Sequence, residues 1–438
     1  VGAMGPPGGA RNPVDPRFIS LFNTFEIQFP TEDNLRTIYA SILTSHVGKL
    51  SGEIQKAAAG LTDVTLRLYN HVLEKLPPTP SRFHYIFNLR DLSRIYEGLL
   101  CSVDDKVKSM GDFLRLWRNE ALRIFHDRLI SAEDKEIVIG KMKELVQEKY
   151  GATAEVILAD PILYGDYLNA SKEVQGEEGV LRLYQDVGTY ADIKPLFEEI
   201  LTCYNEKHKT MNLVFFEDAL EHLTRIHRII RLDQGNALLV GVGGSGKQSL
   251  SKLAAYTAGC GVFEITLTRG YDENMFREDL KELYTMIGVE NKKVMFLFTD
   301  SHVADEGFLE LINNMLTSGM VPALYADEEK DSVINGIRDE VAKKGLGETK
   351  EACWSYYVDR CRTNLHVVLA MSPVGDTLRT RCRNFPGMVN NTVIDWFTPW
   401  PEDALRSVSE VFLKDLDMPD AFRETVTEHM VMTHQSVR

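Results

Sequence analysis

Residues 235–250, GNALLVGVGGSGKQSL, join an apolar run to a glycine-rich loop that ends in a lysine. The loop fits the spacing G-x-x-x-x-G-K, in which backbone N–H groups and the lysine ammonium surround phosphate oxygens. The residues before the loop favour a strand, and those after it favour a helix whose N-terminus would face the phosphates. We therefore predict a phosphate site rather than a plain glycine-rich turn, formed by Gly241, Val242, Gly243, Gly244, Ser245, Gly246 and Lys247.

The residue after the lysine departs from this pattern. A Ser or Thr at that position normally gives its hydroxyl to Mg²⁺, whereas Gln248 offers only a longer amide oxygen. Ser249 lies about 100° further around the helix and is a poor substitute. We expect Gln248 to be a weak Mg²⁺ ligand.

A second chemical element follows the apolar run 293–299, where Asp300 would hold Mg²⁺ through water. The alternative is that Asp300 only caps the next helix. Hydrolysing P-loop proteins place a carboxylate at the next position, and a general base is worth ~10² to 10⁴ in rate, but this chain has Ser301 there. Asp305 and Glu306 are expected on a downstream helix that points elsewhere, so rescue by either is the lesser alternative.

A third element is the apolar run 364–371, followed by Ser372. In this fold its strand lies between the other two and carries a polar residue toward the γ-phosphate, where Ser372 is a shorter donor than the common Asn. Three positions that serve hydrolysis are therefore altered, while the loop that serves binding is intact. This pattern predicts nucleotide binding with little turnover.

The elements that position these residues fall into two groups. From about 32 to 150, apolar residues recur at spacings of three and four, which predicts an all-helical unit. There, Asn88 is expected as an N-cap with Asp91 at N3, which puts Arg90 in the first helical turn. From about 155 to 400, apolar strands alternate with helices, which predicts an α/β unit whose parallel sheet is buried on both faces. The expected strands are 236–242, 262–268, 293–300, 364–373 and 392–397.

The bulk composition excludes several classes of protein. The chain has 438 residues, 44% of them apolar and 26% charged, which is typical of a globular protein with two or three domains. A net charge of −15 argues against nucleic-acid binding, and no apolar run is long enough to span a membrane. The six cysteines lack C-x-x-C pairs and read as reduced thiols, and the histidines show no metal pattern. The missing initiator Met predicts a fragment of a longer protein.

The two ends of the chain resemble each other. Residues 4–23 align with 371–390 without a gap at Met, Pro, Gly, Phe and Asn, and EDNLR recurs as EDALR at 402–406. Both copies precede a helix-rich segment in the same order. This repeat predicts the end of one module followed by most of a second.

Several segments of the chain resemble a known family. The phosphate loop, FEDALEHLTRIHRIIR, NLHVVLAMSPVGDTLRTRCRNFPGMVNNTVIDWF, GAMGPPGGARNPVDPRF and HYIFNLRDLSRI closely resemble the dynein heavy chain motor. The resemblance implies the end of the third AAA+ large domain at 1–31 and its helical small domain at 32–154. It further implies the fourth AAA+ large domain at 155–400 and the start of the fourth small domain at 401–438. Ser301, Ser372, RCRNFP and IDWFTPWP resemble the axonemal branch.

The resemblance also implies a function: part of the ATP-driven, minus-end-directed microtubule motor ring of a cilium or flagellum axoneme, within the cytoplasm and cytoskeleton. The fourth module would hold ATP or ADP with Mg²⁺ in a regulatory or structural role. Implied partners are the rest of the ring, a microtubule reached through a stalk outside this segment, and intermediate and light chains bound elsewhere. A self-contained P-loop ATPase and a nucleotide-free AAA+ scaffold are the alternatives.

Nucleotide sites of this family lie between neighbouring modules. By resemblance, Lys247 and Asp300 belong to the fourth site, and Arg90 is the sensor arginine of the third. Arg17 resembles an arginine finger for the second site, and Arg383, close to the Phe that aligns with Phe18, resembles one for the third. The ungapped alignment places Asn384 opposite Arg17, so the choice among Arg379, Arg381 and Arg383 stays open.

Overall fold

The computed structural model describes residues 2–4, 13–177, 179–347, 349–414 and 416–437. An isolated short helix, α1 (Pro16–Ile19), buries no residue. An all-helical unit follows, as predicted: α2 (Glu32–Val47), α3 (Gly52–Lys75), α4 (Leu89–Leu100), α5 (Met110–Phe125), α6 (Ala132–Tyr150) and α7 (Ala154–Leu158).

The start of α4 forms as the sequence indicates. The Asn88 side chain accepts a hydrogen bond from the N–H of Arg90 at 2.8 Å, and Asp91 accepts from the Asn88 N–H at 3.0 Å. Because this reciprocal cap satisfies N–H groups that have no partner within the helix, it fixes where α4 begins. The prediction that Arg90 lies in the first turn is therefore confirmed.

The second unit is built on a parallel sheet in the order β4–β5–β6–β3–β7. Its strands are β3 (Ala237–Val240), β4 (Gly261–Phe263), β5 (Val294–Thr299), β6 (Leu365–Met371) and β7 (Val393–Trp396). The strand β6 lies between β3 and β5, as predicted, so the phosphate loop, Asp300 and Ser372 all follow strand ends at one edge of the sheet. The α/β prediction is confirmed.

Helices cover both faces of this sheet. Alternate residues of one strand belong to different cores: Leu239 packs with α10 (Glu217–Arg231) and α11 (Lys247–Thr257), and Leu238 packs with the helices on the other side. The helices on that second side are α12 (Glu273–Tyr284), α13 (Gly307–Ser318), α14 (Asp327–Lys343) and α15 (Lys350–Asn364). Burial of every residue of β3, β5 and β6 explains why these strands read as continuous apolar runs.

Two features differ from the sequence prediction. The strand expected at 262–268 is only three residues long, because β4 is an edge strand paired with β5 alone and the chain leaves the sheet after Phe263. A small antiparallel pair, β1 (Tyr164–Gly165) with β2 (Gln185–Asp186), was not predicted, since two residues per strand give no periodicity. Helices α8 (Ala170–Val174) and α9 (Tyr190–Lys207) complete this region.

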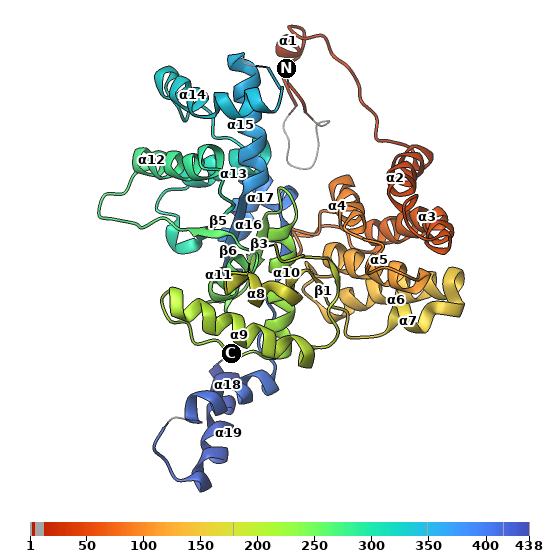
Figure 1. The fold of residues 1–438 in the computed structure, drawn as a ribbon, viewed down its shortest axis with the longest axis vertical. Coiled ribbons are helices and arrows are strands. Elements are labelled where there is room, and N and C mark those ends of the chain that lie inside the picture. The colour runs from red at the N-terminus through yellow and green to blue at the C-terminus, as the bar shows by residue number, and fades with distance from the viewer. Residues whose placement is uncertain (1, 5–12, 178, 348, 415, 438) are drawn as a thin grey trace.

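The helical unit packs directly on the sheet unit, and one apolar core runs through both (Figure 1). Buried ion pairs cross the contact: Arg228 Nε donates to Glu120 Oε2 at 2.9 Å, and Arg225 Nε lies 3.1 Å from Asp127 Oδ2. The backbone N–H of Trp396 in β7 donates to the Asp127 carbonyl at 3.1 Å. The position of the helical unit against the sheet is therefore set by packing and by matched charges.

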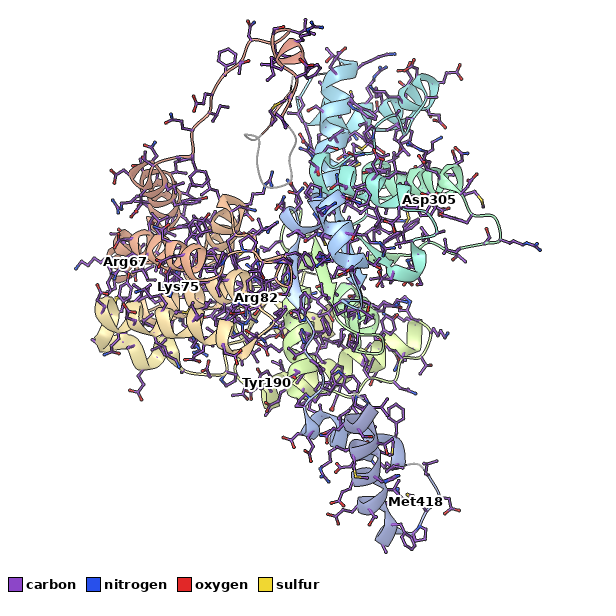
Figure 2. The ribbon with its side chains drawn as sticks, turned by 180° about the vertical axis from the view of Figure 1, so that it is seen from behind. Arg67, Lys75, Arg82, Tyr190, Asp305 and Met418 are labelled. Atoms are coloured by element: carbon purple, nitrogen blue, oxygen red, sulfur yellow. The ribbon has the colours of Figure 1, made fainter. Side chains whose placement is uncertain are left out.

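The chain closes with four further helices. Beside the sheet lie α16 (Thr377–Asn384) and α17 (Gly387–Asn390), and α18 (Glu402–Lys414) and α19 (Asp420–Val437) project from the end of the molecule (Figure 1). Figure 2 shows Arg67 and Lys75 on the helical unit, and Tyr190, at the start of α9, close to the base of α18. No described helix is both long and apolar enough to cross a membrane.

Candidate nucleotide site

The loop between β3 and α11 has the geometry of a phosphate cradle. Gly246 adopts a left-handed φ of 89° directly before α11, a conformation that side chains rarely tolerate. A Cβ on Gly241 would come within 2.6 Å of Phe397 Cβ, so this position also requires glycine. Among the described residues, no backbone hydrogen bond engages the N–H groups of Gly243, Gly244 or Gly246. Unpaired N–H donors at a helix N-terminus are what a phosphate group needs, so the loop fits this ligand.

The Lys247 ammonium is folded back onto its own loop. Its Nζ donates to the carbonyl oxygens of Gly241 at 2.6 Å and Val242 at 2.8 Å, and lies 3.2 Å from Ser245 Oγ. Burial lowers the pKa of Lys247 below its usual value, and the nearby charge of Asp300 opposes that shift. The lysine is therefore a cation held beside the loop by weak carbonyl partners that phosphate oxygens can replace.

Asp300 begins a short 3₁₀ turn after β5, and both of its carboxylate oxygens are engaged. Oδ2 accepts the backbone N–H of Ser372 at 2.5 Å, and Oδ1 accepts Arg381 Nη1 at 2.9 Å. The structure thus brings together Asp300 and Ser372, as the sequence predicted, and adds Arg381. Ser372 contributes its backbone N–H here, while its hydroxyl accepts a long hydrogen bond of 3.4 Å from the Val374 N–H.

Ser301 offers no general base. Its hydroxyl lies 2.7 Å from Thr299 Oγ1, and His302 turns Nδ1 back to accept the Thr299 N–H at 3.2 Å. The prediction for the two downstream acids was partly wrong. Asp305 and Glu306 precede α13 rather than lie within it, and Glu306 turns toward the site, where Arg381 bridges it to Asp300. The N–H of Gly307 donates to Asp305 Oδ1 at 2.7 Å, which keeps the Asp305 side chain in the turn before α13.

Gln248 and Ser249 occupy the first turn of α11. Gln248 is exposed, and no hydrogen bond engages its side chain among the described residues. Ser249 instead lines a cavity beside the loop. The oxygen donors for a metal are therefore one carboxylate that already has two partners and one untethered amide, a set that fits Mg²⁺ poorly.

A cavity that the sequence does not predict adjoins the phosphate loop. It has a volume of about 230 Å³ and opens beside Gly244 and Gly246. Much of its apolar wall comes from two segments that are distant in sequence: Leu213, Val214, Phe216, Trp400, Val408 and Phe412. Trp400 and Phe216 meet edge to face, with ring centroids 5.2 Å apart. A mostly apolar cavity next to a phosphate cradle suits a nucleotide base.

The arginines considered as fingers separate on α16. Arg379 and Arg383 are exposed and lie four residues apart on one face, whereas Arg381 is largely buried and turns inward to Asp300 and Glu306. On α4, Arg90 is exposed, and Arg94, one turn on, donates to the carbonyl oxygens of Asn390 at 3.3 Å and Thr392 at 3.0 Å. The second turn of α4, which carries Arg94, therefore lies beside residues 390–392, in the segment that follows α16.

Other predicted residues lie apart from this site. Arg17, on α1, is exposed, and so is Phe18, whereas the aligned Phe385 packs against the sheet core. The matched Pro and Gly of the first repeat copy fall at 6 and 8, outside the described residues. All six cysteines are free thiols, and no cluster of three His, Cys, Asp or Glu residues occurs in the part of the chain that the structure describes.

Comparison with known proteins assigns the family. A family model described as "P-loop containing dynein motor region D4" matches residues 211–438, and an "AAA+ lid domain" model matches 61–159. The Dynein-1-alpha heavy chain of the flagellar inner arm I1 complex of Chlamydomonas reinhardtii is 70% identical over 442 residues, and human Dynein axonemal heavy chain 10 is 57% identical over 438. A ciliary dynein beta chain of Heliocidaris crassispina is 40% identical over 441 residues.

Each of these alignments covers 100% of this chain but only 10% of the relative, so the chain spans about a tenth of the length of the curated relatives it matches. The relatives are flagellar, axonemal and ciliary heavy chains, which confirms the predicted axonemal branch. The matched D4 region contains the phosphate loop, and the matched lid contains the helices packed against the sheet. The chain therefore belongs to the axonemal dynein heavy chain family, of which it contains the D4 motor region and an AAA+ lid.

Proposed function

We propose that this segment is a regulatory part of the ATP-driven microtubule motor ring of an axonemal dynein, and that its fourth module holds ATP or ADP with weak or no hydrolysis. The observation that carries the proposal is an open phosphate loop with Lys247 in place, next to an Asp300 that is followed by Ser301. The loop supplies the N–H donors and the lysine that phosphate binding needs. Ser301, after the end of β5, cannot supply the general base that hydrolysis needs.

The binding step follows from the loop and the cavity. The N–H groups of Gly243, Gly244 and Gly246 would donate to phosphate oxygens, and Lys247 would exchange its carbonyl partners for them. The base would lie in the cavity between the 212–216 segment and α18. Since α18 supplies Val408 and Phe412, the bound base would also fix α18 against the sheet unit.

The slow chemical step follows from four residues. Ser301 cannot take a proton from an attacking water at neutral pH, and a general base accounts for ~10² to 10⁴ in rate. Gln248 and the doubly engaged Asp300 are a poor donor set for Mg²⁺, so a metal would neutralise the charge of the β- and γ-phosphates less effectively. Ser372 directs its N–H to Asp300, so that N–H is not available to the γ-phosphate.

The segment would also contribute to neighbouring sites. We assign 1–31 and 32–154 to the third module, and 155–400 and 401–438 to the fourth. Arg90 and Arg383 would then reach the third nucleotide site as sensor and finger. Both side chains are exposed, and Arg94, one turn after Arg90, contacts Asn390 just beyond α16, which supports this assignment. Arg17 would reach the second site. The remaining partners would be the rest of the ring, the microtubule through the stalk, and the intermediate and light chains.

The test uses the complete heavy chain with the phosphate-loop lysines of its other modules replaced by Ala. We expect one nucleotide per chain after denaturation, identified by mass spectrometry, and little phosphate release. Rapid phosphate release would instead support a self-contained ATPase at this site. Absence of nucleotide, with no uptake at millimolar ATP in a calorimeter, would support an empty AAA+ scaffold.

A further inference from the structure

Arg381 forms an ion-pair bridge inside the fourth module. Its Nη1 donates to Asp300 Oδ1 at 2.9 Å, while Nε and Nη2 donate to Glu306 Oε1 at 3.0 and 2.8 Å. Only 11% of the Arg381 side chain is exposed, against 39% for Asp300 and 57% for Glu306. The arginine is therefore held by three charge-assisted hydrogen bonds on the inner face of α16, away from Arg379 and Arg383.

This bridge places a permanent cation next to Asp300, the carboxylate that a metal ion would bind. A guanidinium has no acceptor and stays protonated in proteins, so Arg381 cannot become a metal ligand or lose its charge. Asp300 gives one of its oxygens to Arg381 and the other to the Ser372 N–H. A divalent cation that approached Asp300 would meet a carboxylate with both oxygens engaged, and it would be repelled by the guanidinium.

Glu306 is a second ion-pair partner of Arg381. It accepts two hydrogen bonds from Arg381 and is not bonded to Asp300. If Arg381 released Asp300, it would keep its contacts with Glu306 and would not need to leave the inner face of α16. The exchange therefore breaks one hydrogen bond rather than three.

We infer that Arg381 is an internal competitor for Mg²⁺ at Asp300, a positioning residue of the fourth site rather than an arginine finger for the third. This inference rests on the proposed nucleotide binding at Lys247. Arg381, which is not part of the phosphate-loop motif, would then be the reason why the fourth site coordinates a metal weakly. The nucleotide would bind largely through the loop and Lys247, and the metal would add little until Arg381 moves.

The test measures Mn²⁺ affinity in the presence of ADP by electron paramagnetic resonance, in the complete heavy chain with its other phosphate-loop lysines replaced. Arg381→Gln should raise Mn²⁺ affinity about tenfold, the low end for loss of a hydrogen bond to a charged group. Arg379→Gln is the matched control, because Arg379 lies on the same helix but, among the residues that the structure describes, pairs only with the exposed Asp376. Its Mn²⁺ affinity should equal that of the wild type.

Glu306→Gln provides a second variant with the opposite sign. Without Glu306, Arg381 has Asp300 as its remaining carboxylate partner, so Mn²⁺ affinity should fall below wild type. In the Arg381→Gln background the same change should have no effect, which separates this competition from direct metal binding by Glu306. If Arg381→Gln alone does not fold, Glu306→Gln still tests the inference, because an Mn²⁺ affinity equal to or above that of the wild type overturns it.

The outcomes separate the two proposals. If ADP binds and Mn²⁺ affinity is the same in wild type, Arg381→Gln and Glu306→Gln, the competitor role is overturned while the proposed function stands. An effect of Glu306→Gln that persists without Arg381 also overturns it. If ADP does not bind to the wild type, the proposed function fails, and the inference that rests on it fails too.

Discussion

His222 Nδ1 lies 2.7 Å from Asp395 Oδ2, and this contact joins the wall of the proposed base cavity to the surface between the helical unit and the sheet. The imidazole also stacks on Phe397 with ring centroids 3.8 Å apart. Asp395 Oδ1 accepts Arg225 Nη1 at 3.0 Å, and Arg225 pairs with Asp127 of the helical unit. A buried chain of charges thus runs from the cavity to the lid.

Replacing Asp395 with Asn should destabilise the segment by about 1 to 3 kcal/mol, the cost of leaving buried polar groups poorly paired. Asp395 is 1% exposed, and both of its oxygens are used. The free energy of unfolding in urea gives the measurement. Asp376→Asn, at a position 78% exposed, is the control and should stay within about 0.5 kcal/mol of wild type. Equal stability of the two variants would contradict a structural role for the chain of charges.

Replacing Lys247 with Ala should reduce nucleotide retention at this site by at least about tenfold, because the phosphate charge then faces only backbone dipoles. Lys252→Ala is the matched control, since Lys252 lies on the same helix but pairs with Glu264 at 2.8 Å. Bound nucleotide is quantified after denaturation, with the other phosphate-loop lysines of the complete chain replaced. Undiminished nucleotide in Lys247→Ala would show that the loop is not the binding site.

Replacing Ser301 with Glu should raise phosphate release only modestly, because Gln248 and the engaged Asp300 still handicap the metal. Ser301→Gln has nearly the same size but cannot accept a proton, so it should remain at the wild-type rate. Single-turnover phosphate release measures both variants. A gain of more than ~10³ in Ser301→Glu would mean that the missing base is the sole defect and that Gln248 and Asp300 do not limit the rate.

The local parts of the site were predictable because their signals are local. The glycine spacing fixed the position of Lys247, continuous apolar runs predicted β5 and β6, and the Asn88 cap sits three residues before Asp91 as the pattern requires. Each of these features depends on residues within a few positions of one another. A single sequence therefore carries them.

The non-local parts were not predictable from one sequence. Arg381 and Asp300 are 81 positions apart, and nothing in RCRNFP distinguishes an inward arginine from an outward one until α16 is placed beside β5. The base cavity draws its walls from residues near 213, 250, 400 and 408, none of which forms a motif by itself. The predicted length of the edge strand β4 was too great, because apolar residues continue past Phe263, where pairing with β5 stops.

Acid should loosen the contact between the helical unit and the sheet. His84 is 1% exposed, stacks on Trp396 at 4.6 Å, and lies 2.9 Å from the Arg128 carbonyl through Nε2. Burial lowers the pKa of His84 to about 4. Between pH 4 and the ordinary value near 6.5, the unfolded chain then binds more protons than the folded one, so stability is complete above about 6.5 and falls as the pH drops toward 4.

Unfolding free energy measured from pH 7.5 to 4.5 tests this expectation. Burial also lowers the pKa values of His227 and His366 to about 4, so several histidines share the slope. His84→Phe keeps an aromatic ring against Trp396 but cannot titrate, and it should reduce the slope by up to about 1.4 kcal/mol per pH unit. An unchanged slope in His84→Phe would contradict the assignment.

The last prediction concerns the third nucleotide site, to which this chain would contribute only one side. Arg383 is exposed near the C-terminal end of α16, on the face opposite Arg381, and Arg90 is exposed on α4, whose Arg94 contacts the segment just beyond α16. The planar guanidinium can pair two phosphate oxygens and stays charged at any working pH, which suits a residue that acts across a module boundary.

In the complete motor, Arg383→Ala should therefore lower ATP turnover at the third site and leave the nucleotide on Lys247 unchanged. Arginines that act in trans in related enzymes are worth ~10³ to 10⁵ in rate, so even a poorly placed finger gives a measurable loss. Turnover is measured with the main site disabled, for Arg383→Ala beside Arg379→Ala and Arg381→Ala. Because Arg381 points to Asp300 of its own module, Arg381→Ala should change metal affinity at the fourth site and spare the third. Arg379, on the same outer face as Arg383, is the only rival on this helix. A loss in Arg379→Ala alone would move the finger to that position, and unchanged third-site turnover in all three variants would show that α16 supplies none.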